Sequence, residues 1–374
     1  MKKCLLLSSI VLLFFACNNK SVQIVDCEKF KTSQCSFPVE TFNFTCANVY
    51  NDRLYYSDRA SDGKLLISYD FSTNKLDTIA QENEIEDICI LNDTTIFYAD
   101  YSTIGLYVFL NKVNGECDLL KDITKRFAHP FWGHDYYFNP VITHPLILQS
   151  ESEGVVFCFS TEESDNKFRR LAKDNIPLYM HFKRKDSANW DVSFFGTYPS
   201  KNDNENYYEG NFLNCFYNPE KHCFVCHTRL DANVVLCDSL GKPVKEIEFS
   251  SQKFNTPQPY PITDLHSMQA SSNYFWSNTT YGIIGYDKYR KVYLRVVLLP
   301  RQPDADAMLK ENIMDFVIIV ADEDFNIKYE VFFDGEKYVQ PYYKFLINEK
   351  GLLVFEKNNK SREHSYTASW FVFE

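Results

Sequence analysis

The sequence predicts an all-β protein, and three observations support this prediction. Aromatic residues make up 16% of the chain, mostly Phe and Tyr, and together with Val, Ile and Thr they suit half-buried strands better than helices. Short apolar runs alternate with polar turns along most of the length. Only residues 305–316, with Asp304 as a candidate N-cap, have the pattern of a short helix.

The N-terminus has the layout of an export signal. In residues 1–16 two lysines precede an apolar run that ends in a small residue, as in a secretory signal peptide. Cys17 follows directly, and the tetrapeptide FFAC resembles a bacterial lipobox, in which the cysteine is lipidated. We therefore expect a signal peptide at 1–16, a lipidated Cys17 and tether at 17–30, and one domain at 31–374. The alternative is an ordinary cleaved signal with Cys17 as an incidental thiol.

Composition excludes several functions. The 374 residues carry a formal net charge of −11 and no long basic run, so nucleic-acid binding is not expected. The 12 glycines form none of the glycine-rich nucleotide-binding or esterase motifs. We expect no cofactor.

Four segments share a strand, turn, strand pattern typical of β-hairpins. They are residues 65–79, 106–120, 234–249 and 317–333, and the first run of most of them ends near an Asp. The pair Asp322 and Asp324 fits turn chemistry better than a calcium loop, which needs more oxygen ligands and a glycine. Further units occur at 154–172 and 342–374. The repeating unit is thus a meander of three or four antiparallel strands.

Recurring meanders predict a β-propeller. Counting inner strands from near residues 54, 95, 155, 223, 282 and 343 gives six blades of irregular length. Two β-sandwich domains are the alternative architecture.

The sequence resembles an uncharacterised family of exported bacterial lipoproteins, domain-of-unknown-function family 4221. The FFAC tetrapeptide, the runs ending in YD or CD, the stretch 281–295 and the run 345–355 carry this resemblance. It implies a six-bladed β-propeller in the cell envelope of a Gram-negative bacterium, and it brings no catalytic residues.

Twelve cysteines invite a disulfide framework, but most of them lie in apolar strand-like runs, where cysteine acts as a small hydrophobe. We expect mainly free, buried thiols, with Cys27 and Cys35 as the best candidate pair. The motif at 223–227 matches the CxxCH of haem attachment. Within a strand, however, Cys226 would face away from Cys223 and His227, which argues against haem.

One loop, residues 129–140, is rich in side chains that suit a small ligand. The candidate binding residues are His129, Trp132, His134, Asp135, Tyr136 and Tyr137. A metal held by His129, His134 and Asp135, or a packed connection between blades, are the alternatives.

The sequence therefore leaves two functions open. The first is a monomeric, membrane-anchored propeller that binds a glycan, a peptide or a partner protein without catalysis. The second is a propeller hydrolase or lyase that acts on an exported polymer. No catalytic residues are assigned.

Overall fold

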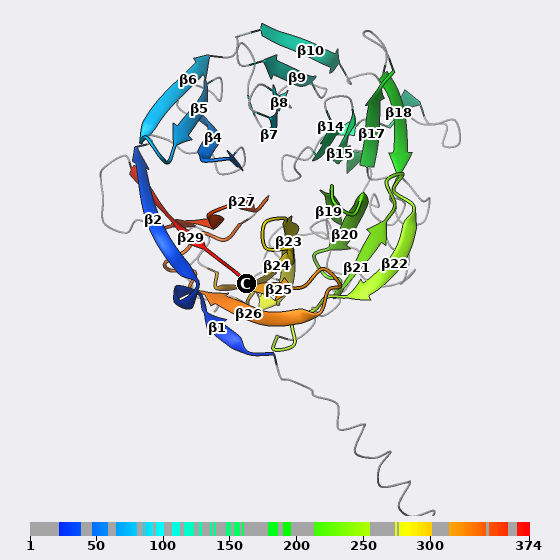
Figure 1. The fold of residues 1–374 in the computed structure, drawn as a ribbon. Helices are drawn as coiled ribbons and strands as arrows, with labels where there is room; N and C mark the ends of the chain where they lie inside the picture. Colours follow the sequence, from blue (N-terminus) through cyan, green and yellow to red (C-terminus); the bar gives the residue numbers. More distant parts are fainter. Residues whose placement is uncertain are drawn as a thin grey trace, which may run out of the picture.

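The computed structural model describes the following residues, with only the backbone described for most of those between 95 and 195: 22–38, 47–58, 65–80, 85, 87–92, 95–100, 107–112, 116–122, 127–128, 135–136, 138–139, 147–150, 153–157, 159–160, 179–185, 190–195, 213–254, 274, 277–300, 314–341, 344–357 and 365–374. They form a ring of antiparallel sheets, so the all-β propeller prediction is confirmed (Figure 1). The candidate helix at 305–316 lies largely outside them.

Three consecutive sheets follow the chain through the first half of the ring, each with four strands in its hydrogen-bonding order. The first is β3 (Asn48–Tyr50), β4 (Arg53–Asp58), β5 (Leu65–Asp70) and β6 (Lys75–Ala80). The second is β7 (Asp87–Asn92), β8 (Thr95–Asp100), β9 (Tyr107–Lys112) and β10 (Glu116–Asp122). The third is β14 (Ile147–Ser150), β15 (Glu153–Phe157), β17 (Tyr179–Arg184) and β18 (Trp190–Phe195).

Three further sheets of the described residues lie in the same ring. The fourth is β19 (Leu213–Asn218), β20 (Cys223–Thr228), β21 (Asn233–Cys237) and β22 (Pro243–Glu248). The fifth is β23 (Thr280–Asp287), β24 (Val292–Leu298), β25 (Phe316–Ala321), β26 (Ile327–Phe333) and β1 (Ile24–Asp26). The sixth is β27 (Leu346–Asn348), β28 (Gly351–Glu356), β29 (Ser365–Phe371) and β2 (Lys31–Pro38).

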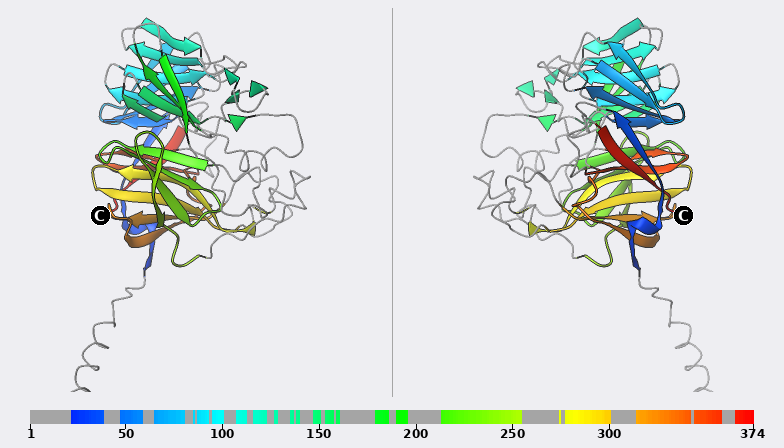
Figure 2. Two further views of the ribbon diagram at one scale, coloured as in Figure 1. Left: turned by 90° about the vertical axis from the view of Figure 1, so that its right-hand side faces the viewer. Right: turned by 90° about the vertical axis from the view of Figure 1, so that its left-hand side faces the viewer.

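Short pieces accompany these sheets: β11 (Phe127–Ala128) pairs with β12 (Asp135–Tyr136), β13 (Phe138–Asn139) pairs with β16 (Phe159–Ser160), and the 3₁₀ helix η1 spans Cys27–Lys29. The large sheets form a ring in the face-on view (Figure 1), and in the side views they stand next to one another in a single layer (Figure 2). This arrangement excludes the two separate sandwiches that the sequence left open. Within the residues described above, no helix combines the length and the apolar character that a membrane crossing requires.

The N-terminal strand closes the ring. β2 pairs with the last strand, β29, from Lys31 opposite Phe371 to Pro38 opposite Ser365. Just before it, β1 runs parallel to β26 in the adjacent sheet, and Cys27 is buried between the two sheets. Residues 24–30, which belong to the segment expected to act as a tether, are therefore packed against the ring.

All four predicted hairpins are present, and aspartate side chains shape the turns of three of them. In the turn between β25 and β26, Asp322 Oδ1 accepts hydrogen bonds of 2.9 Å from the backbone amides of Asp324 and Asn326. Asp70 and Asp238 accept backbone amides in the same way after β5 and β21. The turn chemistry expected for Asp322 and Asp324 is thus confirmed.

The inner strands differ from the sequence-based count. The strands that neighbour one another around the centre are β3, β7, β14, β19, β23 and β27. The positions counted near 54, 95, 155 and 223 fall instead on β4, β8, β15 and β20, the second strands of their sheets. At β3 and β14 the count was displaced because these strands have only 3 and 4 residues, too few for a recognisable alternation.

The apolar core lies between adjacent sheets. One cluster joins the fifth and sixth sheets through buried side chains such as Leu294, Ile318 and Val354. A second, containing Leu54, Phe355 and Trp370, joins the sixth sheet to the first. A third joins the fourth sheet to the fifth. These clusters hold the fourth, fifth, sixth and first sheets at fixed positions, so the inner strands of these sheets form a stable wall on one side of the centre.

Candidate functional site

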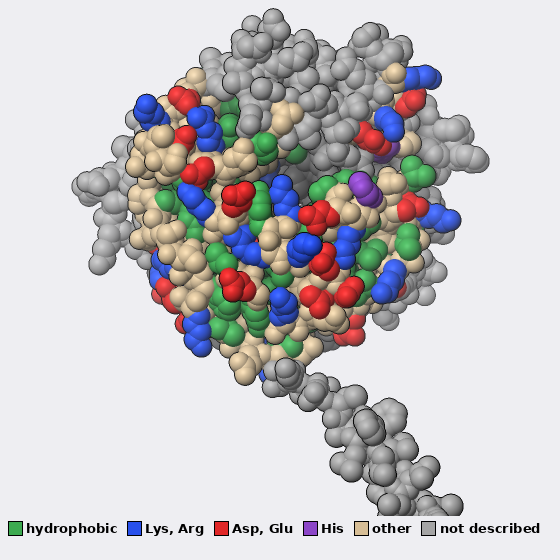
Figure 3. Space-filling view, viewed as in Figure 1, with side chains coloured by type: hydrophobic (Ala, Val, Ile, Leu, Met, Phe, Trp, Pro, Cys, Tyr) green, Lys and Arg blue, Asp and Glu red, His purple; other side chains and the backbone are tan. Residues whose placement is uncertain are grey.

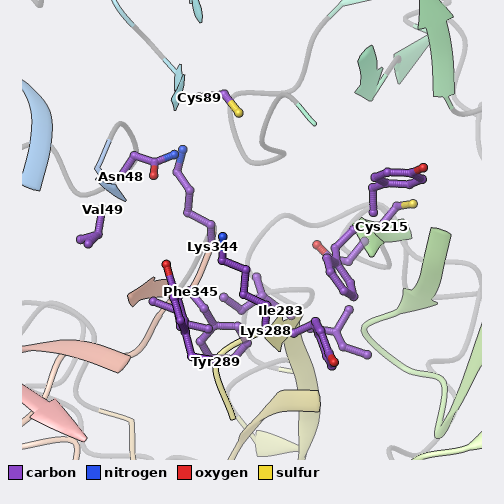
Figure 4. Close-up of a pocket in the computed structure, with 16 residues that line it drawn as sticks. Asn48, Val49, Cys89, Cys215, Ile283, Lys288, Tyr289, Lys344 and Phe345 are labelled. Atoms are coloured by element: carbon purple, nitrogen blue, oxygen red, sulfur yellow. The ribbon is translucent and has the colours of Figure 1, made fainter. Parts of the chain in front are cut away.

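A pocket of about 330 Å³ lies at the centre of the ring, where inner strands from several sheets meet (Figure 4). Its volume is within the range of small-ligand sites. Its walls come from β3, β7, β19, β23 and β27 and from residues adjoining the last two. The lining residues are Asn48, Val49, Cys89, Asn214, Cys215, Phe216, Tyr217, Ile283, Ile284, Gly285, Tyr286, Lys288, Tyr289, Lys344, Phe345 and Ile347.

Two lysines give this pocket a positive character. Lys344 precedes β27, and its Nζ donates a 2.7 Å hydrogen bond to the carbonyl oxygen of Ile88 on β7. Lys288 follows β23 and is exposed, with its Nζ 5.1 Å from the centroid of the Tyr289 ring. Among the lining residues that the structure describes there is no Asp, Glu or His. The pocket of an acidic chain thus presents ammonium groups, which favour a ligand with an anionic or strongly hydrogen-bond-accepting group.

Aromatic rings form the other main component of the wall. Tyr286 packs against Tyr293 with ring centroids 5.0 Å apart, and Tyr293 stacks on Phe325 at 4.0 Å. Behind them Asn218 Nδ2 donates to the Tyr293 hydroxyl at 2.9 Å. These contacts fix the ring of Tyr286 at the pocket, while Tyr289, 39% exposed, remains accessible to a ligand.

A glycine allows the sixth sheet to approach the fifth at this pocket. A Cβ added at Gly285 would lie 2.7 Å from Cδ2 of Phe345. The Phe345 ring therefore lies directly against the backbone of β23, and a larger residue at position 285 would displace it. Gly285 thereby sets the shape of the pocket wall between β23 and β27.

Acidic side chains lie just outside the pocket and are tied to its wall. The Tyr286 hydroxyl lies 3.0 Å from Glu220 Oε2 and 3.1 Å from Glu323 Oε1, both of which accept from it. Burial, with the two carboxylates, raises the pKa of Tyr286 well above its usual value. The hydroxyl therefore stays protonated at neutral pH. Side chains of both charges lie below and beside the middle of this face of the molecule (Figure 3).

The loop singled out in the sequence lies mostly outside the described residues. His129, Trp132, His134 and Tyr137 are not described, nor is Cys17. For Asp135 and Tyr136 the backbone alone is described, in β12. The ligand role of this loop and the lipidation of Cys17 remain predictions.

The CxxCH motif lies in a strand, as expected, because it begins β20. His227 is buried, with Nδ1 3.2 Å from Nη2 of Arg295. Cys226 instead contacts Cys215 across the sheet. Cys226 thus faces away from His227, and the motif does not fit haem. Over the described part of the chain, no three His, Cys, Asp or Glu side chains gather in a way that could hold a metal ion.

The seven cysteines that the structure describes are free thiols, as expected, and the candidate exception, a Cys27–Cys35 pair, is wrong. Cys27 is buried in the cluster between the fifth and sixth sheets, whereas Cys35 packs against the cluster between the sixth and first. Cys35 Sγ lies 3.5 Å from the Ala368 carbonyl oxygen on the neighbouring strand. The two side chains therefore lie in different core clusters, although only seven residues separate them in the sequence.

The pocket residues themselves were missed by sequence analysis. The stretch 281–295, which contributes Tyr286, Lys288 and Tyr289, stood out only as a blade pattern. The lysine and tyrosine side chains around a strand end were an available signal, but Lys344 and Cys89 become neighbours of this stretch only through the ring.

The ring of antiparallel sheets around a central pocket defines a β-propeller protein. No protein-family model matches the chain, and no curated protein matches its sequence. Among solved structures it is similar to a member of domain-of-unknown-function family 4221 from Bacteroides vulgatus, with 17% identity over 94% of this chain and 98% of that chain and a TM-score of 0.70. It is also similar to a candidate exported protein from Bacteroides fragilis, with 12% identity, coverages of 94% and 98%, and a TM-score of 0.53. These similarities show a shared fold.

Proposed function

We propose that this chain is a monomeric, six-bladed propeller of the Gram-negative cell envelope, anchored through a lipid on Cys17, that binds a glycan, peptide or partner protein without transforming it. The observation that carries this proposal is the central pocket. Its tyrosine rings and its two ammonium groups can hold a ligand, and no carboxylate or imidazole among its described lining residues is placed for acid–base chemistry.

The pocket favours a particular ligand chemistry. Tyrosine faces suit the apolar faces of sugar rings and peptide side chains, and Lys288 and Lys344 suit carboxylate groups. The ligand is therefore an oligosaccharide or peptide that inserts an acidic unit into the pocket. The volume of about 330 Å³ accommodates one such unit. The rest of the ligand lies outside the pocket, over the surface of the ring.

The envelope location is supported by residues 1–17 and by one structural relative. Two lysines, an apolar run and the FFAC tetrapeptide precede a cysteine. The similarly folded Bacteroides fragilis protein is named as a candidate exported protein. Mass spectrometry of the mature N-terminus should find acyl chains on Cys17, and an unmodified Cys17 or cleavage elsewhere would remove the anchor from the proposal.

Calorimetric titration with acidic oligosaccharides and acidic peptides tests the binding function. Lys288→Ala and Tyr289→Ala change exposed side chains and should leave the melting temperature unchanged. Each variant removes one contact to the ligand and should weaken binding about tenfold. A tenfold change corresponds to about 1.4 kcal/mol of binding free energy. Lys245→Ala and Leu240→Ala, at exposed positions on and beside β22, should bind as the wild type does.

The same samples separate binding from turnover. Chromatography of each oligosaccharide after incubation should recover it intact. Shortened or unsaturated products would establish the alternative, a hydrolase or lyase. Equal affinity in the pocket variants and in their controls would place the binding surface elsewhere and contradict the proposed role of the pocket.

A further inference from the structure

Three cysteines converge on one face of the fourth sheet. Cys215 on β19 and Cys226 on β20 are direct partners in the antiparallel register, and their sulfur atoms lie 3.1 Å apart. Cys237 on β21 interacts with Cys226 from the other side. Cys223 stands an odd number of positions from Cys226 in the same strand and therefore points to the opposite face.

The geometry of the first pair suits a disulfide. Directly opposed residues in antiparallel strands have Cα atoms about 4.5–5.5 Å apart, within the range of about 4.4–6.8 Å found in disulfides. The sulfurs need to approach by about 1 Å to reach the bonded distance of about 2.05 Å. Rotation of the two side chains can shorten this separation.

The register disfavours the competing pair. Cys226 lies opposite Val235, and Cys237 lies opposite Phe224. Cys226 and Cys237 are therefore diagonal neighbours, for which the backbone separation is about 7–8 Å. That separation exceeds the disulfide range, so Cys226 is better placed to bond Cys215 than Cys237.

Access to the two sulfurs is unequal. Cys215 is half-buried and lines the central pocket, whereas Cys226 is only 5% exposed. The contact with Cys215, together with burial, raises the pKa of Cys226, so this thiol stays protonated in the dithiol form. A reagent entering the pocket meets Cys215 first, with Cys226 directly behind it.

We propose that Cys215 and Cys226 form a reversible disulfide by exchange with a disulfide-bearing oxidant that enters through the pocket. The Cys215 thiol loses its proton and attacks one sulfur of the oxidant, which releases one thiolate and leaves a mixed disulfide on Cys215. Cys226 then loses its proton and attacks the Cys215 sulfur, displacing the second thiolate. Two protein thiols are oxidised and one oxidant disulfide is reduced to two thiols, so the exchange balances.

This exchange makes one wall of the pocket a covalent modification site. In the dithiol form Cys215 offers a polarizable thiol to the pocket, and in the disulfide form its sulfur is turned toward β20. An exported location would supply the oxidising conditions under which such a bond persists. The chemistry itself depends only on the two opposed side chains and on access to Cys215.

The test is peptide mapping of the intact purified protein after incubation with oxidised glutathione. Free thiols are alkylated under denaturing, non-reducing conditions before digestion. Trypsin cleaves after Lys221 and Arg229, so Cys215, Cys226 and Cys237 fall in three different peptides. The Cys223→Ala variant is mapped in parallel, since Cys223 shares a peptide with Cys226.

The expected result is one linkage between the peptides of Cys215 and Cys226, in the wild type and in Cys223→Ala, with the loss of two alkylatable thiols. Dithiothreitol should restore both thiols. Cys237→Ala should keep the linkage, and Cys226→Ala should retain glutathione on Cys215. A linkage from Cys226 to Cys237, or full alkylation of Cys215 and Cys226 after oxidation, would overturn the proposal. The wild-type map decides the outcome even if a variant fails to fold.

Discussion

The guanidinium carbon of Arg295 lies 3.7 Å from the centroid of the Tyr281 ring, deep in the core between the fourth and fifth sheets. Arg295 is fully buried and donates hydrogen bonds to the carbonyl oxygens of Asp231, Ala232 and Phe249 at 2.6, 2.8 and 2.6 Å. Burial lowers its pKa to about 10, so it remains charged at neutral pH. One side chain on β24 thus fixes the turn after β20 and the end of β22.

Replacing this arginine should destabilise the ring. Arg295→Met keeps an unbranched chain in the core but leaves three carbonyl oxygens without their donor, each worth about 1–3 kcal/mol when buried. We expect a loss of about 3–5 kcal/mol in the free energy of unfolding by urea. Arg53→Met is the control, because Arg53 is 42% exposed and its pairs with Asp70 and Asp77 should contribute under about 1 kcal/mol. Similar losses in both variants would contradict this account.

Ring closure by the N-terminal strand should depend on Glu356. This carboxylate on β28 accepts hydrogen bonds of 2.7 Å from Lys31 and Gln34, both on β2, and another from Ser369. Burial alone would raise its pKa, but these donors outweigh burial and lower it. At pH 7 we expect Glu356→Gln to lose about 2 kcal/mol of unfolding free energy.

The pH dependence of this variant follows from the direction of the pKa shift. A carboxyl group whose pKa is lowered by folding stabilises the protein above its unfolded value, near 4.5, and loses that contribution as the pH falls through the folded value. The difference between wild type and Glu356→Gln should therefore shrink as urea titrations move from pH 7 to below pH 4.5. The exposed Glu336→Gln serves as the control. A difference that stays constant over this range would refute the assignment.

The hairpins could be predicted from the sequence because their turns depend on hydrogen bonds between nearby residues. The pocket could not be predicted because its residues come together only in the folded ring. The Asp residues that end apolar runs, such as Asp70 and Asp322, bond backbone amides within four residues, so their signal lies in one short segment. The pocket instead joins Asn48, Cys89 and Lys344, which are brought together only when β2 pairs with β29 and closes the ring.

Strand length explains one misreading, and strand pairing explains one contact that the sequence did not reveal. The inner strands β3 and β14 are too short to show period-two alternation, so the second strands were counted in their place. Cys215 and Cys226 are 11 residues apart and looked like ordinary strand residues, but their antiparallel register places them face to face. Pairing between strands is the information that a single sequence lacks.

The turn from β27 to β28 should tolerate only glycine at position 351. Gly351 has a φ of 131°, and a Cβ there would collide with the carbonyl oxygen of Phe371 on β29. Gly351→Ala therefore combines backbone strain of about 1–3 kcal/mol with a clash against the closing sheet. We expect the free energy of unfolding by urea to fall by at least about 3 kcal/mol, because the backbone strain and the clash act together. Lys350→Ala, one residue away and exposed, should lose under about 1 kcal/mol. A tolerated alanine at 351 would show that the turn can rearrange.

The hydroxyl of Tyr286 holds two acidic side chains at the mouth of the pocket. Tyr286→Phe keeps the ring against Tyr293 but removes the donor shared by Glu220 and Glu323. Without it the two carboxylates repel each other, and the turns that carry them, after β19 and after β25, lose their link to β23. Because the site is partly exposed to solvent, we expect a modest loss of about 1–2 kcal/mol in unfolding free energy.

Tyr289→Phe is the matched control for this variant, since the Tyr289 ring is 39% exposed and should change stability by less than about 0.5 kcal/mol. Added salt distinguishes the mechanism, because it screens repulsion between exposed carboxylates but restores no hydrogen bond. Raising the salt concentration should therefore recover part of the stability lost in Tyr286→Phe. If salt recovered none of it, the role of the hydroxyl would be hydrogen bonding alone, and the carboxylates would contribute no measurable repulsion at the mouth of the pocket.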